Sequence, residues 1–259
     1  KLIMNYSSVS MQSLFLSNIS RKLRIPVFCL NHGINNHYQI YKFKDKFSPN
    51  NFLAWTNDNV KFYSKHQLTN RFISHPSLVL NNKNIDDSGK KIKNILIYLN
   101  PGSMNFIDQT FQDLFNFTSI FSKLNYRVFF KAKKTNTAHL DLFFQKIINP
   151  KKLDNKINFY KDHDNNNQLI NNADLVIVSM YSTVIMDVIL NRKKLIITSP
   201  ENLSLDFVDI KKIPFARTNN QILQIIRANN FSDYFNYCDN IISYNLLNSY
   251  SLNMLGATK

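Results

Sequence analysis

From residue 94 onward, short apolar segments of strand length alternate with longer segments that have helical periodicity. The expected strands are residues 94–99, 126–131, 157–160, 173–179 and 194–198, and the expected helices are residues 106–124, 139–148, 165–171, 182–191 and 219–228. Strands that alternate with helices pair in parallel through right-handed crossovers, with helices on both faces of the sheet. The pattern therefore predicts an α/β domain, and ligands of such sheets bind beyond the carboxyl ends of the strands.

The residues before this region predict a second, smaller α/β unit. Expected strands are residues 25–30, 52–55 and 71–74, and expected helices are residues 8–23 and 57–65. Residues 81–93, reading NNKNIDDSGKKIK, are polar and lack periodicity, which is typical of a linker. We therefore expect one domain over residues 1–80 and a larger one over residues 81–259.

Composition narrows the class of protein further. Hydrophobic residues make up 44% of the 259 residues, which excludes wholesale disorder. Cys29 and Cys238 belong to no CxxC pair, so a thiolate zinc site is not expected, and two isolated thiols suit a reducing cytoplasm. The net charge of +15 has two explanations: an anionic partner, or an AT-rich codon bias that favours Lys, Asn, Ile, Phe and Tyr. The codon bias explains most of it, because the short basic clusters at residues 42–46, 131–134 and 192–194 are scattered.

Residues 173–200, reading ADLVIVSMYSTVIMDVILNRKKLIITSP, form the most informative segment. A buried strand ends in small hydroxyl residues, and Ser182 suits the N-cap of the following helix. The Ser182 and Thr183 hydroxyls, with the free amides of the first turn, would bind an anion. Asp187 lies one turn further, where its carboxylate would accept hydrogen bonds from a ribose. The alternative, slightly favoured by these residues alone, is an ordinary capped helix with Asp187 on a solvated face.

Three further positions are candidates, each with a plain alternative. His32 follows a buried strand in IPVFCLNHGI, where a neutral imidazole would accept a proton, and the alternative is a polar turn histidine with no role. Lys131 ends the strand in YRVFFKAKK and would neutralise phosphate charge, or belong to a solvated basic loop. Ser103 lies in the turn after the first strand of the larger domain, which lacks a glycine-rich phosphate motif.

Residues 173–200 resemble the donor-binding stretch of GT-B glycosyltransferases. The likeness is to bacterial capsule and surface polysaccharide enzymes and to CDP-glycerol glycerophosphotransferases, which read "ADLVIS..ST...EAL..GKPVI". Ser182, Thr183 and Asp187 match by position, with Asp187 in place of the usual glutamate and Asn191-Arg192 where a glycine is common. The segment at residues 25–34 resembles the "IPtv.LQHGi" element of the same families. Lys131 matches the lysine of their "KP" motif, but the proline is absent.

This resemblance implies a GT-B-like fold with two Rossmann-like domains, of which the C-terminal one is complete and the N-terminal one truncated. It implies that His32 is the catalytic base and that Asp187 binds the ribose. The donor phosphates would be bound by Lys131, Ser182, Thr183 and Ser103. Neither a metal nor a cofactor is expected besides the nucleotide-activated donor itself.

The expected function is glycosyl or polyol-phosphate transfer in surface polysaccharide biosynthesis. The partners would be a nucleotide-sugar donor and a glycan or lipid-linked acceptor, with no nucleic acid. The location would be cytoplasmic, with peripheral contact at the inner face of the membrane, which the positive charge favours. Two alternatives are open: a UDP-sugar 2-epimerase, for which no convincing set of acid/base carboxylates is visible, and a non-catalytic basic nucleic-acid or membrane-binding protein, which would need a concentrated basic face.

Overall fold

The computed structural model describes just over half of the residues of the chain. They are residues 3–5, 15, 19–20, 22–25, 27–30, 51–54, 56–58, 60–61, 72–74, 89–99, 120–121, 124–132, 157–160, 165–179, 182, 184–198 and 209–255. The expected helix at residues 139–148 lies outside them, as does most of the one at residues 106–124.

The chain divides into two compact units. Unit 1 comprises Lys1–Leu80, Ser204–Ile210 and Tyr237–Lys259, and unit 2 comprises Asn81–Leu203 and Lys211–Asn236. The first break thus follows residue 80. The sequence-based division into residues 1–80 and 81–259 stays a prediction. These units place Ser204–Ile210 and Tyr237–Lys259 together with the N-terminal residues.

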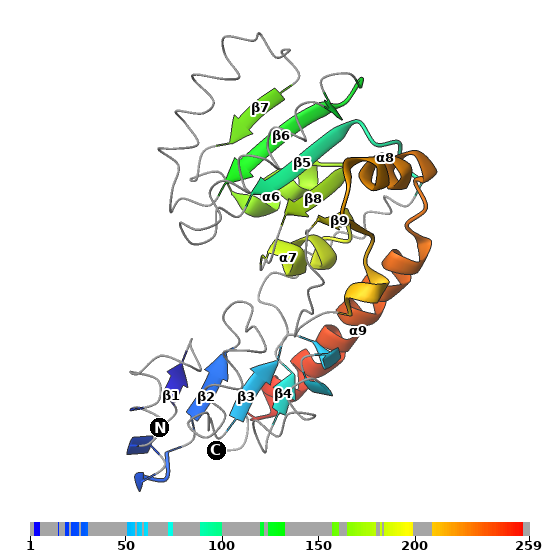
Figure 1. Cartoon of the computed structure of the whole chain (residues 1–259). Coiled ribbons are helices and arrows are strands. Elements are labelled where there is room, and N and C mark those ends of the chain that lie inside the picture. The colour runs from blue at the N-terminus through cyan, green and yellow to red at the C-terminus, as the bar shows by residue number, and fades with distance from the viewer. Residues whose placement is uncertain are drawn as a thin grey trace. The chain divides into compact units, whose positions relative to one another are not determined.

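Unit 2 is built on a six-stranded sheet in the order β10-β9-β8-β5-β6-β7, in which every neighbouring pair is parallel. Its strands are β5 (Asn94–Leu99), β6 (Arg127–Ala132), β7 (Ile157–Tyr160), β8 (Leu175–Ser179) and β9 (Lys194–Thr198), which Figure 1 labels, together with β10 (Phe215–Ala216). The five strands expected from the sequence are confirmed to within two residues at each end, and β10 was not expected. The parallel α/β architecture is therefore confirmed.

The central strands are apolar throughout because both faces of the sheet are covered. Side chains in the middle of the sheet are almost completely buried: Ile95, Leu96, Ile97, Leu175, Val176, Ile177, Val178, Leu195 and Ile196. Helix α6 (Asn166–Asn172) contacts β5 and α7 (Val184–Leu190), while α7 also contacts β8 and β9 (Figure 1). The pair α6 and α7 thus lies on one face of the sheet.

Helix α8 (Asn219–Ala228) begins and ends with recognisable caps. At its start the Thr218 side chain accepts a hydrogen bond from the Gln221 amide, and the Gln221 side chain accepts one from the Thr218 amide. At its end Asn229 has a φ of 46°, the left-handed conformation that terminates helices. Ile222 and Ile226, one turn apart, are the buried residues of this helix.

An internal carboxylate fastens the amino ends of β5 and β8 together. Asp174 immediately precedes β8, and its Oδ2 accepts hydrogen bonds from the Lys93 amide at 3.1 Å and the Asn94 amide at 2.8 Å. Its Oδ1 lies 2.8 Å from the Lys90 Nζ. Burial by itself would raise the pKa of Asp174, but the Lys90 ammonium and the two amides outweigh it and hold this pKa below its usual range. Asp174 therefore fixes where the two central strands begin.

The basic cluster at residues 192–194 is not a surface patch. Lys193 and Lys194 are each only 1% exposed. The Lys194 Nζ donates to the Lys90 carbonyl at 2.5 Å and to the Asn229 Oδ1 at 2.8 Å, and it lies 5.7 Å from the centre of the Phe231 ring. The Lys194 ammonium thus stabilises the left-handed end of α8 from inside the unit, which removes these two lysines from any concentrated basic face.

Unit 1 contains a four-stranded parallel sheet in the order β1-β2-β3-β4. Its strands are β1 (Ile3–Asn5), β2 (Val27–Leu30), β3 (Asn51–Ala54) and β4 (Phe72–Ser74) (Figure 1). Three of them match the expected strands closely, whereas β1 was not expected. A short 3-10 turn, η4 (Ile210–Lys212), leads back toward unit 2 in the chain.

The long helix α9 (Ser232–Leu255) was also missed by the sequence interpretation. Its first residues belong to unit 2 and the rest, from Tyr237, to unit 1. The buried side chains Tyr234, Phe235, Cys238 and Ile241 recur at helical spacing. That periodicity is readable in the sequence, but the many intervening Asn, Ser and Tyr residues obscure it because they favour turns as readily as helices.

Tyr237 connects α9 to two other segments of unit 1. Its hydroxyl donates to the Asp58 Oδ2 at 2.7 Å and accepts from the Asp209 amide at 2.7 Å. Burial, followed by the Asp58 carboxylate, raises the pKa of Tyr237 far above its usual value. The phenol of Tyr237 is therefore neutral at pH 7.

We expect Tyr237→Phe to lower the free energy of unfolding by about 1–2 kcal/mol, because it leaves a part-buried amide and a carboxylate oxygen without this partner. Chemical denaturation followed by circular dichroism measures the change. Tyr126→Phe, at a half-buried tyrosine of unit 2, serves as the control. Equal stabilities of Tyr237→Phe and the wild type would show that the Tyr237 hydroxyl does not fasten unit 1.

Candidate functional site

The register of the sheet in unit 2 brings the carboxyl ends of four strands to one level. Leu99 of β5 pairs with Ala132 of β6 and with Ser179 of β8, and Ser179 pairs with Thr198 of β9. The segments that follow these strands therefore start at the same edge. Because ligands of parallel sheets bind at this edge, it is the place where the sequence-predicted residues can meet.

Tyr98, the penultimate residue of β5, lies on the face of the sheet that α6 and α7 cover. Its hydroxyl donates to the Asn166 Oδ1 in the first turn of α6, at 3.3 Å. The ring is buried. Burial and the nearby Asp187 carboxylate, in that order, raise the pKa of Tyr98 above its usual value, so the phenol stays protonated. A protonated phenol at this edge is a hydrogen-bond donor.

Lys131 lies next to Tyr98 in the sheet. The two residues are Cα partners on neighbouring parallel strands, and paired residues project to the same face, about 4.8 Å apart between strands. Lys131 is within β6 and is 5% exposed, so the alternative of a solvated basic loop is wrong for this residue. A buried lysine therefore lies beside a protonated phenol at this end of the sheet, on the side of α6 and α7.

Asp187 lies in α7, and its surroundings differ from those of an ordinary solvated helix carboxylate. It is half-buried, and removal from water raises its pKa from 3.8 to about 6. Its charge acts on the Tyr98 phenol of β5, so the carboxylate lies toward the sheet. The alternative of a solvated face is therefore wrong for Asp187. A carboxylate that has lost its water gains more than a solvated one from hydroxyl groups of a ligand.

Ser182 occupies the N-cap position expected from the sequence. Its Oγ accepts a hydrogen bond from the Val184 amide at 3.3 Å, and its carbonyl accepts one from the Ile185 amide at 3.2 Å. Ser182 is half-buried at the junction between β8 and α7. The local sequence explains the arrangement, because Ser182 comes three residues after the end of the apolar strand β8 and just before a helix with five buried positions.

We call Tyr98, Lys131, Asn166, Ser182 and Asp187 the carboxyl-edge cluster. Three of its members were predicted from the sequence, and Tyr98 and Asn166 were not. A polar aromatic residue at the end of an otherwise aliphatic strand was the available signal for Tyr98. Asn166 gave no signal, because asparagine is common throughout this chain. The remaining predicted residues, His32, Thr183 and Ser103, lie outside the described residues and stay predictions.

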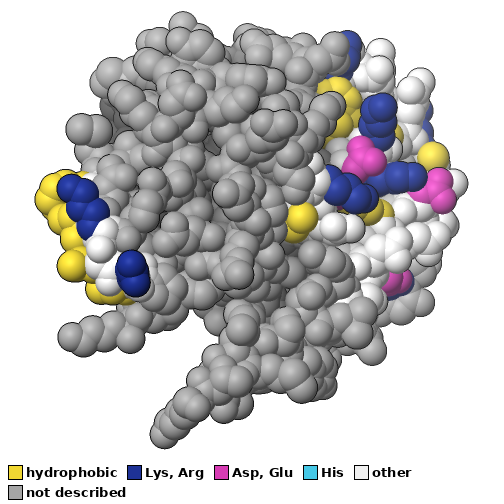
Figure 2. Space-filling view, turned by 90° about the horizontal axis from the view of Figure 1, so that it is seen from below, with side chains coloured by type: hydrophobic (Ala, Val, Ile, Leu, Met, Phe, Trp, Pro, Cys, Tyr) yellow, Lys and Arg dark blue, Asp and Glu magenta, His cyan; other side chains and the backbone are white. Residues whose placement is uncertain are grey.

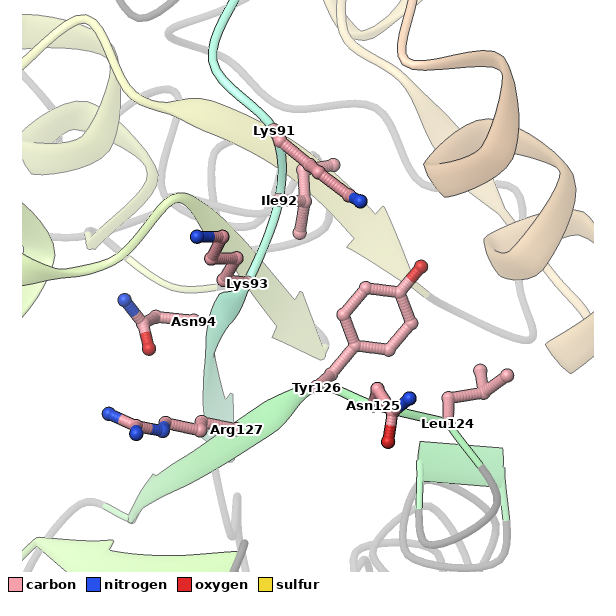
Figure 3. Close-up of a pocket in the computed structure, with 8 residues that line it drawn as sticks. All are labelled: Lys91, Ile92, Lys93, Asn94, Leu124, Asn125, Tyr126 and Arg127. Carbon is pink, nitrogen blue, oxygen red and sulfur yellow. The ribbon is translucent and has the colours of Figure 1, made fainter.

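A pocket of about 580 Å³ opens at the opposite, amino-terminal edge of the same sheet, as Figure 3 shows. Its lining comes from the starts of β5 and β6 and the segments before them: Lys91, Ile92, Lys93, Asn94, Leu124, Asn125, Tyr126 and Arg127. The charged ends of Lys93 and Arg127 extend to the same side in Figure 3. None of the sequence-predicted site residues lines this pocket, and parallel sheets bind their ligands at the other edge.

The part of the chain that the structure describes lacks two kinds of feature. Within it, no group of three or more His, Cys, Asp or Glu side chains is placed to hold a metal ion. Nor does any helix among these residues have the length and apolar character needed to cross a membrane.

Comparison with solved structures identifies the fold. The chain resembles HepE of Anabaena in complex with UDP-glucose, with a TM-score of 0.56 and 13% identity over 98% of this chain and 78% of that one. It resembles the spinosyn rhamnosyltransferase SpnG in complex with spinosyn aglycone, with a TM-score of 0.59 and 9% identity over 97% and 72% of the two chains. It also resembles OtsA, with a TM-score of 0.53 and 9% identity over 95% of this chain and 69% of that one. No family model and no curated protein sequence matches the chain.

These neighbours are GT-B glycosyltransferases, and the chain accordingly has a GT-B-like fold with Rossmann-like parallel sheets. At such low identities the likeness shows the fold alone. The narrower resemblance to capsule and CDP-glycerol enzymes stays a prediction.

Proposed function

We propose that the protein transfers a glycosyl group from a nucleotide-activated sugar to a hydroxyl acceptor, in the biosynthesis of a surface polysaccharide. The observation that carries the proposal is the carboxyl-edge cluster on a GT-B-like fold. There a desolvated carboxylate, Asp187, lies beside the Tyr98 phenol, and the Lys131 ammonium is on the same face of the sheet. Structural neighbours of this fold hold UDP and UDP-glucose.

The chemistry of the cluster suits the two polar parts of a nucleoside diphosphate. Asp187 would accept hydrogen bonds from the ribose hydroxyls, which replace the water that burial has removed. Lys131 would donate toward the phosphates, together with Ser182, Thr183 and Ser103 of the segments that follow β8 and β5, while the Tyr98 hydroxyl donates to Asn166. Fixed donors at a departing diphosphate are the main source of rate acceleration in a transferase that uses no metal.

In the proposed reaction the acceptor oxygen forms a bond to the anomeric carbon, and the bond from that carbon to the phosphate oxygen breaks. The nucleoside diphosphate leaves with the electron pair. His32 takes the acceptor hydroxyl proton, as its place in the IPVFCLNHGI segment suggests by resemblance. The protein needs no cofactor beyond the donor, and the acceptor is a glycan or lipid-linked glycan.

Calorimetric titration of the full chain with UDP, UDP-glucose, CDP, CDP-glycerol and CMP tests the donor assignment. Binding of UDP and UDP-glucose supports glycosyl transfer. Binding restricted to CDP and CDP-glycerol would shift the assignment to polyol-phosphate transfer at the same site. A folded sample that binds none of the five ligands contradicts the proposal, and salt-sensitive binding of duplex DNA instead would favour the nucleic-acid alternative.

The double variant Ser182→Ala/Thr183→Ala is expected to weaken binding of the nucleotide that the wild type binds by about tenfold or more. The reason is that two hydrogen bonds from hydroxyl groups to a charged phosphate are lost. The matched control is Ser232→Ala, at an exposed serine that begins α9 and lies away from the cluster. Calorimetry gives the dissociation constant of each variant relative to that of the wild type. An unchanged affinity in the double variant would show that these two hydroxyls do not bind the nucleotide. The role of the rest of the cluster is then tested by substitution of Asp187.

A further inference from the structure

An exposed apolar stripe lies on the segment between β1 and β2 of unit 1. Phe15, Ile19 and Leu23 are 65%, 38% and 63% exposed, and among the described residues they are the large hydrophobic side chains that face solvent. Their spacing of four residues places them on one face of a helix. The Leu23 amide donates to the Ile19 carbonyl at 2.9 Å, which is the hydrogen bond of an α-helical turn.

This helical turn exposes its apolar side chains and buries a polar one, which is the reverse of an ordinary surface helix. Ser20, directly beside Ile19 in the chain, is 1% exposed, so the polar residue faces the interior of unit 1 and the apolar stripe faces outward. Amphipathic helices of globular domains normally bury their apolar face. An outward apolar face of this kind marks an interaction surface.

Cations flank the stripe at its carboxyl end. Lys22 and Arg24 are exposed. The turn ends in a defined conformation, since Arg24 has a φ of 53° and the Ile25 amide donates to the Ser20 carbonyl at 2.8 Å. Residues 8–25 contain Arg21, Lys22 and Arg24 but no Asp or Glu. Figure 2 shows hydrophobic side chains beside Lys and Arg side chains at the left edge of the view.

We infer that this face, made of Phe15, Ile19, Leu23, Lys22 and Arg24, binds the surface of an anionic lipid bilayer. Apolar residues on one face with basic residues at its border are the composition by which a helix lies in the interface, with the apolar side chains among the acyl chains and the cations at the headgroups. A second copy of the chain fits this face less well, because residues 8–25 of that copy bring no acidic side chain to pair with Lys22 and Arg24.

The test is co-sedimentation of the full chain with vesicles of phosphatidylcholine alone and of phosphatidylcholine with 30% phosphatidylglycerol, a composition that supplies negative headgroups on the order of those in an anionic leaflet. The wild type is expected to bind the anionic vesicles and not the neutral ones. Phe15→Ser/Leu23→Ser is expected to lower the bound fraction at least fivefold. Because both side chains are exposed, this variant should unfold at the same temperature as the wild type.

The matched charge control separates this face from the general positive charge of the chain. Lys22→Gln/Arg24→Gln is expected to weaken binding to anionic vesicles several-fold. Lys212→Gln/Arg227→Gln removes the same charge from exposed positions of unit 2 and should leave binding within about twofold of the wild type. Leu23→Trp adds a tryptophan that reports insertion into the bilayer. Its fluorescence emission should shift to shorter wavelength with anionic vesicles, whereas the emission of the Arg227→Trp variant should not shift.

Three outcomes would overturn the inference. The first is a folded wild type that does not sediment with anionic vesicles, and the second is a Phe15→Ser/Leu23→Ser variant that sediments as well as the wild type. The third is a dimer in solution that Phe15→Ser/Leu23→Ser converts to a monomer without any change in vesicle binding, which would assign the stripe to a contact between two copies. None of these measurements uses a nucleotide, so their result is independent of the proposed function.

Discussion

Asp174→Ala is expected to lower the free energy of unfolding by about 3 kcal/mol at pH 7. The substitution removes a buried carboxylate that accepts hydrogen bonds from the Lys93 and Asn94 amides and pairs with the Lys90 ammonium at 2.8 Å. Hydrogen bonds to a charged group contribute about 1.5–3 kcal/mol each, but Lys90 is half exposed and regains water when the pair is lost. Urea denaturation followed by circular dichroism measures the difference.

The pH dependence of this effect has a defined sign. The pKa of Asp174 is lower in the folded protein than in the unfolded chain, so its contribution is complete above the unfolded pKa of about 3.9. As pH falls below that value, the contribution is lost. The stabilities of the wild type and Asp174→Ala should therefore differ most above pH 5 and converge toward pH 2–3.

Asp233→Ala provides the comparison for Asp174→Ala. Asp233 is an exposed acidic residue in the first turn of α9, where a carboxylate contributes about 0.3–1 kcal/mol through the helix dipole. If Asp174→Ala costs no more than Asp233→Ala, the carboxylate does not fasten β5 to β8. A difference that stays constant between pH 7 and pH 3 would likewise contradict an electrostatic role.

Asp187→Asn is expected to have two opposite effects: a more stable protein at pH 8 and a weaker nucleotide complex. Burial raises the pKa of Asp187 from 3.8 to about 6, so at pH 8 the folded state holds a desolvated charge that the unfolded chain leaves in water. The amide carries no charge to desolvate. We therefore expect the free energy of unfolding to rise by about 1–3 kcal/mol at pH 8.

The sign of the pH dependence is again decisive. For a carboxylate whose folded pKa is raised, the stability of the wild type increases as pH falls through 6 toward 4, because the folded protein takes up a proton that the unfolded chain does not. Asp187→Asn lacks this proton uptake. The stability advantage of the variant should accordingly disappear between pH 6 and pH 4.

Nucleotide binding should change in the other direction. Loss of the carboxylate as acceptor for two ribose hydroxyls is expected to weaken binding about tenfold to a hundredfold at pH 8, as calorimetry would show. Asp233→Asn, at the exposed acidic residue of α9, should leave both stability and binding nearly unchanged. A variant that is more stable yet binds nucleotide as tightly as the wild type would place the ribose elsewhere and leave Asp187 with no role in binding.

Local patterns in the sequence were sufficient for the framework of unit 2. The continuous apolar runs that became β5, β8 and β9 predict buried parallel strands, since only a strand covered on both faces is apolar at every position. The hydroxyl at Ser182, directly after such a run, predicts the helix start that the structure contains. Shorter and more polar elements were missed, namely β1, β10 and α9, because weak periodicity does not stand out from a chain rich in Asn, Ser and Tyr.

The composition of the candidate site was decided by tertiary structure. Tyr98 and Asn166 are 68 positions apart in the sequence, and only the crossover of α6 over the sheet brings the phenol to the amide. For Lys131 and Asp187 the sequence left open whether the side chain binds a ligand or is solvated, and the structure buries Lys131 within β6 and leaves Asp187 half-buried with a raised pKa. A sequence states which groups a chain carries and the local structure they favour. Desolvation depends on which distant segments cover a residue, and so the chemistry of Lys131, Tyr98 and Asp187 follows from the packing of the sheet and its helices.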